Sequence, residues 1–179
     1  MEFSGLCDWK TVDGGRMKRN RSKLKLAGGG DGGSGNDWVS IEFASSLEKA
    51  REVEGDILGA CQTHKFGEAD IFAIKLSLEE ALVNACKHGN KMDPNKVVRV
   101  QYHVNSQRCD IAIEDQGAGF NPAELPDPTA DENLEMCSGR GILLMRAYMT
   151  SVVFNPQGNK VTLTKFNDSY EPGRNVAMG

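Results

Sequence analysis

"LSLEEALVNACKHGN", residues 76–90, combines an apolar helical stripe with a row of polar side chains. Its apolar residues recur at the three- and four-residue steps of a helix that packs on a core. Asparagine is a poor mid-helix residue and usually has a specific partner there. Three polar residues lie four positions apart, so an α-helix carries them on one side: Glu80, Asn84 and His88.

The chemistry of this polar row has two interpretations. Glu80 and Asn84 offer oxygen ligands of the kind that Mg²⁺ takes, and a carboxylate beside a metal can orient a nucleophile. Lys87 lies next to the row and can reach an anion. The alternative is a solvated polar edge on a partly buried helix, with His88 as a cap or packing residue at the helix end. The helix alone leaves both open.

A second motif follows about 25 residues later, in "DIAIEDQGAGF", residues 110–120. Asp115 ends a predicted strand, and Gly117 and Gly119 let a ligand approach the main chain closely. A buried carboxylate at this place can accept a hydrogen bond from an exocyclic amine such as that of adenine. Losing such a contact leaves a polar group unpaired, so the contact discriminates well. An ordinary Asp-x-Gly turn explains the same residues.

A third motif, "SGRGILLMRAYM" at residues 138–149, places two glycines at the start of an apolar helix. Free main-chain N–H groups and the positive end of the helix dipole favour an anion there, and Arg140 adds charge. Alternatively, a glycine only ends the preceding loop and Ser138 caps the helix. The pattern lacks the spacing of a Walker A loop and of a dinucleotide-binding fingerprint.

The order of the predicted elements sets the fold class. Strands come in adjacent pairs and helices lie between the pairs, which predicts an α+β fold. We expect a two-layer sandwich in which helices cover one face of a mixed, mainly antiparallel sheet. Residues 121–138 form an acidic loop long enough to be a lid or a disordered segment. The predicted strands are 38–44, 97–104, 109–115 and the hairpin 151–166; the predicted helices are 45–64, 68–88 and 141–150.

Charge divides the chain into an arm and a domain. Residues 1–36 carry seven basic and four acidic residues and include the run "GGGDGGSG", so we predict a disordered, basic and glycine-rich arm. Residues 37–167 form the predicted domain, and residues 168–179 form a short tail. Residues 37–179 carry fourteen basic and twenty-one acidic residues, which disfavours direct binding to nucleic acid.

The cysteines and the apolar runs indicate the compartment. Five cysteines are scattered without a C-x-x-C pair, which is typical of reduced thiols in a cytoplasmic protein. No apolar run approaches the roughly 18–20 residues that span a bilayer, and no signal-peptide pattern is present. We therefore expect a cytoplasmic protein without a membrane partner.

The three motifs together, in this order and within about 65 residues, resemble those of the GHKL ATPase superfamily, which has the Bergerat fold. "EEALVNACKHGN" is similar to its N box, "EDQGAGF" to its G1 box and "SGRGILLMRAYMTSV" to its G2 box. The similarity covers roughly residues 38–166. Within the superfamily, the residues of these boxes most resemble those of the bacterial anti-sigma-factor serine/threonine kinases.

This resemblance implies ATP and Mg²⁺ as cofactors and assigns roles to the residues of the N and G1 boxes. Asn84 would be the metal ligand, on the Mg²⁺ that bridges the ATP phosphates. Glu80 would be the general base, or would orient the attacking serine hydroxyl. Asp115 would bind the adenine amine, and Lys87 and His88 stand where relatives often have residues on the nucleotide side.

The glycines of the second and third motifs, together with Arg140, are assigned to the nucleotide as well. Those at the strand end would shape the base and ribose pocket. Those at the helix start would lie by the phosphates, under the lid of residues 121–138. The first set is Gly117 and Gly119, and the second is Gly139, Arg140 and Gly141.

Three features depart from the family pattern. Many relatives carry a threonine that helps to hold the base in the last hairpin, where this chain has Asn159 and Lys160. The predicted lid is acidic, which is unusual beside phosphates. The first 36 residues have no counterpart in the family pattern.

The resemblance implies an ATP-dependent serine/threonine protein kinase that acts as an anti-sigma factor. Its partners would be a sigma factor and a STAS-type anti-anti-sigma protein, which it would phosphorylate; relatives often form homodimers, and this chain leaves a homodimer open. The alternative is a nucleotide-gated protein-binding switch with little or no phosphoryl transfer. Glu80 favours the kinase because a binding site needs no base, whereas the departure at residues 159–160 favours the switch.

Overall fold

The computed structural model describes residues 18–23, 37–122 and 140–170. In this part of the chain six strands form one sheet in the order β1-β2-β3-β4-β6-β5, and every pairing is antiparallel. The strands are β1 (Lys18–Lys23), β2 (Asp37–Ala44), β3 (Val97–Val104), β4 (Arg108–Glu114), β5 (Ser151–Phe154) and β6 (Lys160–Phe166).

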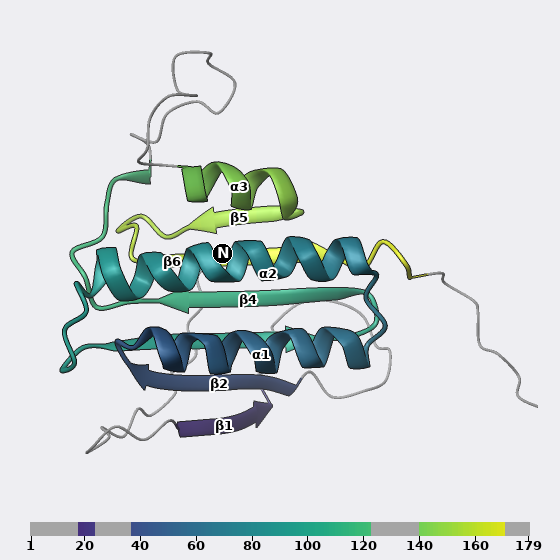
Figure 1. Cartoon of the computed structure of the whole chain (residues 1–179), viewed down its shortest axis with the longest axis horizontal. Helices are drawn as coiled ribbons and strands as arrows, with labels where there is room; N and C mark the ends of the chain where they lie inside the picture. Colours follow the sequence, from purple (N-terminus) through teal and green to yellow (C-terminus); the bar gives the residue numbers. More distant parts are fainter. Residues whose placement is uncertain (1–17, 24–36, 123–139, 171–179) are drawn as a thin grey trace, which may run out of the picture.

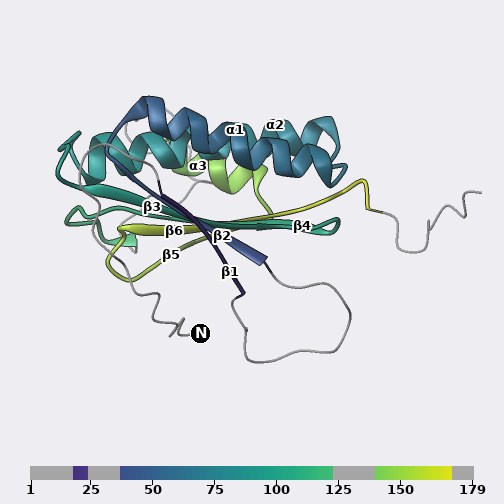
Figure 2. The same ribbon diagram turned by 90° about the horizontal axis from the view of Figure 1, so that it is seen from below.

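The helices form a second layer on one face of this sheet (Figures 1 and 2). They are α1 (Leu47–Thr63), α2 (Glu68–Val83), the π-helix η1 (Asn84–Gly89) and α3 (Arg140–Tyr148). The predicted α+β sandwich with helices on one face is confirmed. No helix among the described residues has the length and apolar character needed to cross a membrane.

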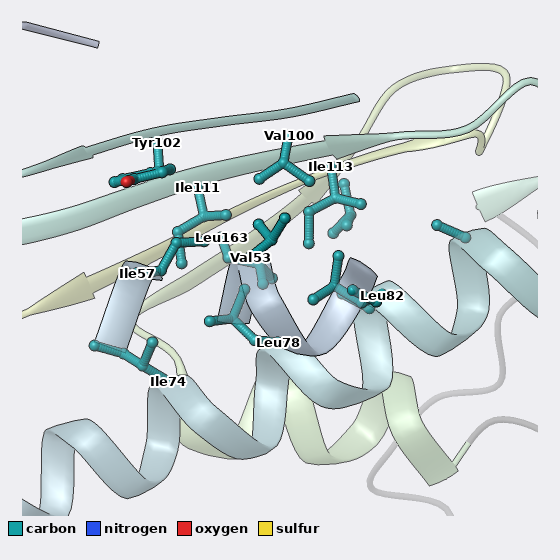
Figure 3. Packing of buried hydrophobic residues seen from close by; sticks show 14 of the residues in the cluster. Val53, Ile57, Ile74, Leu78, Leu82, Val100, Tyr102, Ile111, Ile113 and Leu163 are labelled. Atoms are coloured by element: carbon teal, nitrogen blue, oxygen red, sulfur yellow. The ribbon is translucent and has the colours of Figure 1, made fainter. Parts of the chain in front are cut away.

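The core lies between the two layers because strand side chains alternate between the faces of a sheet. In β3, Val98 and Val100 are fully buried toward the helices, and Arg99 between them lies on the opposite face and pairs with Glu42 of β2. Figure 3 shows the aliphatic side chains of α1 and α2 pointing toward those of β3, β4 and β6. The labelled aliphatic residues are Val53, Ile57, Ile74, Leu78, Leu82, Val100, Ile111, Ile113 and Leu163.

The strand β1 lies inside the arm that was predicted to be disordered, so that prediction is wrong for these six residues. It pairs with β2 from Lys18 opposite Glu42 to Lys23 opposite Asp37. The sequence "KRNRSK" has no apolar alternation, which is the signal that identifies strands in a sequence. Its pairing instead satisfies main-chain groups at the edge of β2.

The end of the second helix also differs from its prediction. A single α-helix was expected to run to His88 and to stop at Gly89, but the α-helix ends at Val83 and continues as the π-helix η1. The main-chain N–H of Asn90 donates to the carbonyl of Ala85, five residues back, at 2.9 Å. Such π segments are rare and often lie at functional sites.

Candidate functional site

The end of β4 meets the end of the π-helix at Asp115. A Cβ atom on Gly89 would clash with the Asp115 carboxylate, and one on Gly117 would clash with the carbonyl of Gly89. Two glycines from different motifs therefore make room for one half-buried carboxylate. Gly89 was interpreted as a helix stop, and the structure places it as a wall of this site.

The Asp115 carboxylate is held in place and is partly desolvated. Its Oδ1 accepts a hydrogen bond from the Gly117 N–H at 2.7 Å. Burial raises the pKa of Asp115 above its ordinary value, and the negative charge of Glu114 adds to this effect. The Gly117 hydrogen bond and the positive charge of Lys96 act in the opposite direction but do not cancel it. The carboxylate is thus poised to gain from a hydrogen-bond donor of a ligand.

Asn90 is a buried amide that ties the ends of three strands together. Its side chain is 0% exposed. Its Nδ2 donates to Ser45 Oγ at 2.8 Å and to the Val97 carbonyl at 3.0 Å. Its Oδ1 accepts from the Gln116 N–H at 2.8 Å. One side chain therefore fixes the segment that carries Asp115 against the ends of β2 and β3.

Replacing Asn90 with aspartate is expected to lower the free energy of unfolding by about 3 kcal/mol, because two donors become acceptors and a charge is buried. Urea unfolding followed by circular dichroism measures the change. Asn95→Asp is the matched control, since Asn95 lies in an exposed turn with Asp93. If Asn90→Asp lowers the free energy of unfolding no more than Asn95→Asp does, the Asn90 amide does not hold these strand ends together.

Glu80, which lies nine residues before Gly89 on the same continuous helix, meets the start of α3. A Cβ atom on Gly141 would clash with Glu80 Oε2 and would lie 3.1 Å from its Cδ. The first and third sequence motifs are therefore in contact. The close approach also brings the main chain at the start of α3 next to a carboxylate on α2.

Asn84, Lys87 and His88 all lie in η1, between Glu80 and Gly89 along the chain. Asn84 is half-buried, whereas Lys87 and His88 are exposed. A π-helix holds more residues in each turn than an α-helix. The predicted row therefore continues from Glu80 to Asn84 but not in the same line to His88.

A further contact locks the loop after Asp115 to the turn between β5 and β6. The Phe120 N–H donates to the Gln157 carbonyl at 3.1 Å. Gly119 and Gly158 have φ values of 75° and 73°, which glycine adopts readily. A Cβ atom on either would clash with the main chain of the opposite segment.

Some predicted site residues lie outside the described residues. These are Gly139, the side chain of Arg140, the capping residue Ser138 and nearly all of the predicted lid. The main chain of Arg140 is the first residue of α3. Their predicted contacts with a nucleotide stay predictions.

The chemical groups of the described residues fit an adenine nucleotide with Mg²⁺. Glu80 and Asn84 offer a carboxylate and an amide oxygen one helical turn apart, and Mg²⁺ takes oxygen ligands while keeping several waters. Bare glycine main chain lies beside both carboxylates, Glu80 and Asp115, where a side chain would fill the space. The fit rests on the chemistry of these groups and on the room that the glycines leave.

Comparison with known proteins agrees with this geometry. Residues 43–165 match the model of a family described as the histidine kinase-like ATPase domain. The chain belongs to this family. The family match starts near the end of β2, so β1 lies outside it. All three motifs, from Glu80 to Gly141, lie inside it.

Relatives with curated names are bacterial regulators. The chain is 27% identical to the serine-protein kinase RsbW of Bacillus licheniformis, over 73% of this chain and 86% of the relative. It is 25% identical to RsbW of Bacillus subtilis strain 168, with the same coverage. It is 35% identical to the anti-sigma F factor of Clostridium perfringens, over 50% of this chain and 65% of the relative.

One solved structure, of the RsbU and RsbW domains of a Mycobacterium tuberculosis protein, also matches. Its TM-score is 0.44 at 14% identity, over 72% of this chain and 32% of that one.

Proposed function

We propose that the protein is an ATP-dependent serine/threonine kinase that acts as an anti-sigma regulatory factor. It phosphorylates a STAS-type anti-anti-sigma protein and binds a sigma factor, in the cytoplasm. One observation carries the proposal: the continuous helix α2–η1 touches both glycine motifs, at Glu80 with Gly141 and at Gly89 with Asp115. One helix therefore contributes to the binding of both the base and the phosphates of one nucleotide. The curated relatives, which are named serine-protein kinases and anti-sigma factors, support the same function.

Asp115 and the glycines around it recognise the base in this proposal. The ionised carboxylate accepts a hydrogen bond from the exocyclic amine of adenine. Gly89 and Gly117 leave the space in which the carboxylate is held, and Gly119 shapes the adjoining loop. Because the carboxylate is partly desolvated, a purine that lacks the amine leaves it unpaired, which penalises the wrong base.

Glu80 and the start of α3 act at the phosphates of the nucleotide in this proposal. Glu80 accepts the proton of the attacking serine hydroxyl or orients that hydroxyl, and Gly141 leaves room for the carboxylate. The N–H groups at the start of α3, with Gly139 and Arg140, stabilise the phosphates. Asn84 holds Mg²⁺, which supplies charge neutralisation at the phosphates when bound. Lys87 and His88 lie on the exposed side of η1, where Lys87 adds positive charge near the phosphates.

A second candidate is a nucleotide-gated binding switch with little phosphoryl transfer. The observation that favours it is the state of Asn159, the residue that replaces a base-contacting threonine of many relatives. Its Oδ1 accepts from Asn155 Nδ2 and its Nδ2 donates to the Asp115 carbonyl, so both ends of the amide are already engaged within the protein. A site with fewer base contacts can bind a nucleotide as a signal without efficient turnover.

The deciding experiment incubates the protein with γ-labelled ATP, Mg²⁺ and a STAS protein encoded next to it. Transfer of the label to a serine of the STAS protein is the expected result. Nucleotide binding without transfer supports the switch instead. Absence of ATP binding contradicts both. A serine-to-alanine STAS variant is the control for nonspecific labelling.

A further inference from the structure

The turn between β5 and β6 contains two asparagines whose side chains form a relay to Asp115. Asn155 Nδ2 donates to Asn159 Oδ1 at 2.8 Å. Asn159 Nδ2 in turn donates to the main-chain carbonyl of Asp115 at 2.9 Å. Asn155 Oδ1 accepts from the N–H groups of Asn159 and Lys160, both at 3.1 Å. Both ends of each amide are thus used, which orients the amides without ambiguity.

Asn159 binds both main-chain polar groups of Asp115. Its carbonyl accepts from the Asp115 N–H at 3.0 Å, while its side chain donates to the Asp115 carbonyl. The ladder between β4 and β6 ends one position earlier, at the pair of Glu114 and Lys160. Asn159 therefore extends the pairing past the regular sheet by one residue, using its side chain where no strand partner continues.

The neighbouring lysine does not share this role. Lys160 Nζ lies 3.4 Å from Glu114 Oε2, and the two side chains face each other across paired positions of β6 and β4. Successive residues of a strand point to opposite faces. The charge of Lys160 is thus neutralised beside Glu114, whereas Asn159 hydrogen-bonds the main chain of Asp115.

We propose that Asn159 is a positioning residue that fixes Asp115 for recognition of the adenine amine. This inference rests on the proposed function. Asn159 does not touch the base itself. It sets the main-chain direction at Asp115, and the Gly117 N–H then sets the direction of the carboxylate. A hydrogen bond depends steeply on angle, so a carboxylate freed to turn recognises the amine less selectively.

The test uses Asn159→Asp, which keeps the shape of the side chain but places an acceptor against the Asp115 carbonyl. Dissociation constants are measured by calorimetry for ATP and for inosine triphosphate, which carries a carbonyl in place of the amine. We expect the preference for ATP over inosine triphosphate to fall by about tenfold, the equivalent of one lost hydrogen bond. Partial unfolding of the variant would weaken the binding of both nucleotides equally and would leave the ratio of their dissociation constants unchanged.

Two further variants keep the test decisive. Asn159→Ala removes the relay without adding charge, and it replaces Asn159→Asp if that variant does not fold. Asn105→Asp makes the same chemical change in the β3–β4 turn, where Asn105 Oδ1 only accepts, from Gln107 and Arg108 N–H groups. We expect the Asn105 variant to keep the wild-type ratio.

The outcomes separate this inference from the proposed function. Wild-type protein that does not bind ATP overturns both. Wild-type protein that prefers ATP, together with Asn159 variants that keep the full preference, overturns only the role of Asn159. In an Asp115→Asn background, Asn159→Asp should change the ratio no further, because the group that it positions is gone.

Discussion

Glu80→Gln is expected to slow phosphoryl transfer to the partner protein by about a thousandfold while ATP affinity stays within about threefold. The substitution keeps the size of the side chain, so the close contact with Gly141 is preserved. It removes the carboxylate that would accept or orient the serine proton. Single-turnover transfer of labelled phosphate measures the rate, and calorimetry measures the affinity.

Glu79→Gln is the matched control for this prediction. Glu79 is the neighbouring residue on α2 and is exposed. The Glu79→Gln substitution therefore makes the same change in charge away from the site. It should leave the transfer rate unchanged. A Glu80→Gln protein with wild-type transfer would exclude Glu80 as the base. Loss of ATP binding in that variant would assign Glu80 to the nucleotide rather than to the hydroxyl.

Asp115→Asn is expected to weaken ATP binding by about a hundredfold, since it removes the carboxylate that would accept a hydrogen bond from the adenine amine. Asparagine keeps an oxygen for the Gly117 N–H, so the loop can retain its conformation. The remaining amide group then meets the adenine amine as a second donor. Calorimetric titration with ATP measures the loss, and inosine triphosphate should bind the variant no worse than it binds the wild type.

The same substitution is expected to stabilise the free protein at neutral pH. The folded-state pKa of Asp115 is raised by burial, so this group favours folding most when protonated. That contribution is present below the ordinary carboxyl pKa and is lost as the pH rises through the raised value. A neutral asparagine avoids this loss, so its melting temperature should exceed that of the wild type at pH 7 and the difference should shrink in acid.

Glu114→Gln is the control for general loss of negative charge near this site. Its carboxylate pairs with Lys160 and lies one residue before Asp115. It should bind ATP nearly as wild type does. Equal weakening in both variants would mean that the net charge, and not the hydrogen bond, determines the affinity.

The elements of the domain could be predicted because their signals are local. Apolar residues at helical spacing predicted the position of α1, which Ser46 caps by accepting from the Lys49 N–H. Alternation identified β3 because Val98 and Val100 face the core. The resemblance assigned both Glu80 and Gly141 to the nucleotide but did not predict that they touch, and no local pattern joins residues about 60 positions apart.

Other parts of the site depend on contacts that a single sequence does not reveal. Asn90 bonds Gln116, 26 residues away, and Asn159 bonds Asp115, 44 residues away. An asparagine beside a glycine or inside a turn is ordinary turn chemistry, so its buried role has no distinct local signal. The change from α2 to η1 at Asn84 likewise has no distinct signal in the apolar periodicity, which predicted one helix to His88.

The strand β1 determines which strand forms this edge of the sheet. Without it, β2 would present a row of bare N–H and C=O groups, the usual starting point for aggregation between sheets. β1 pairs with that row along six positions, from Lys18 opposite Glu42 to Lys23 opposite Asp37. The outermost strand therefore has the sequence KRNRSK, in which four of six residues are basic, and basic residues on an edge strand disfavour pairing with a further sheet.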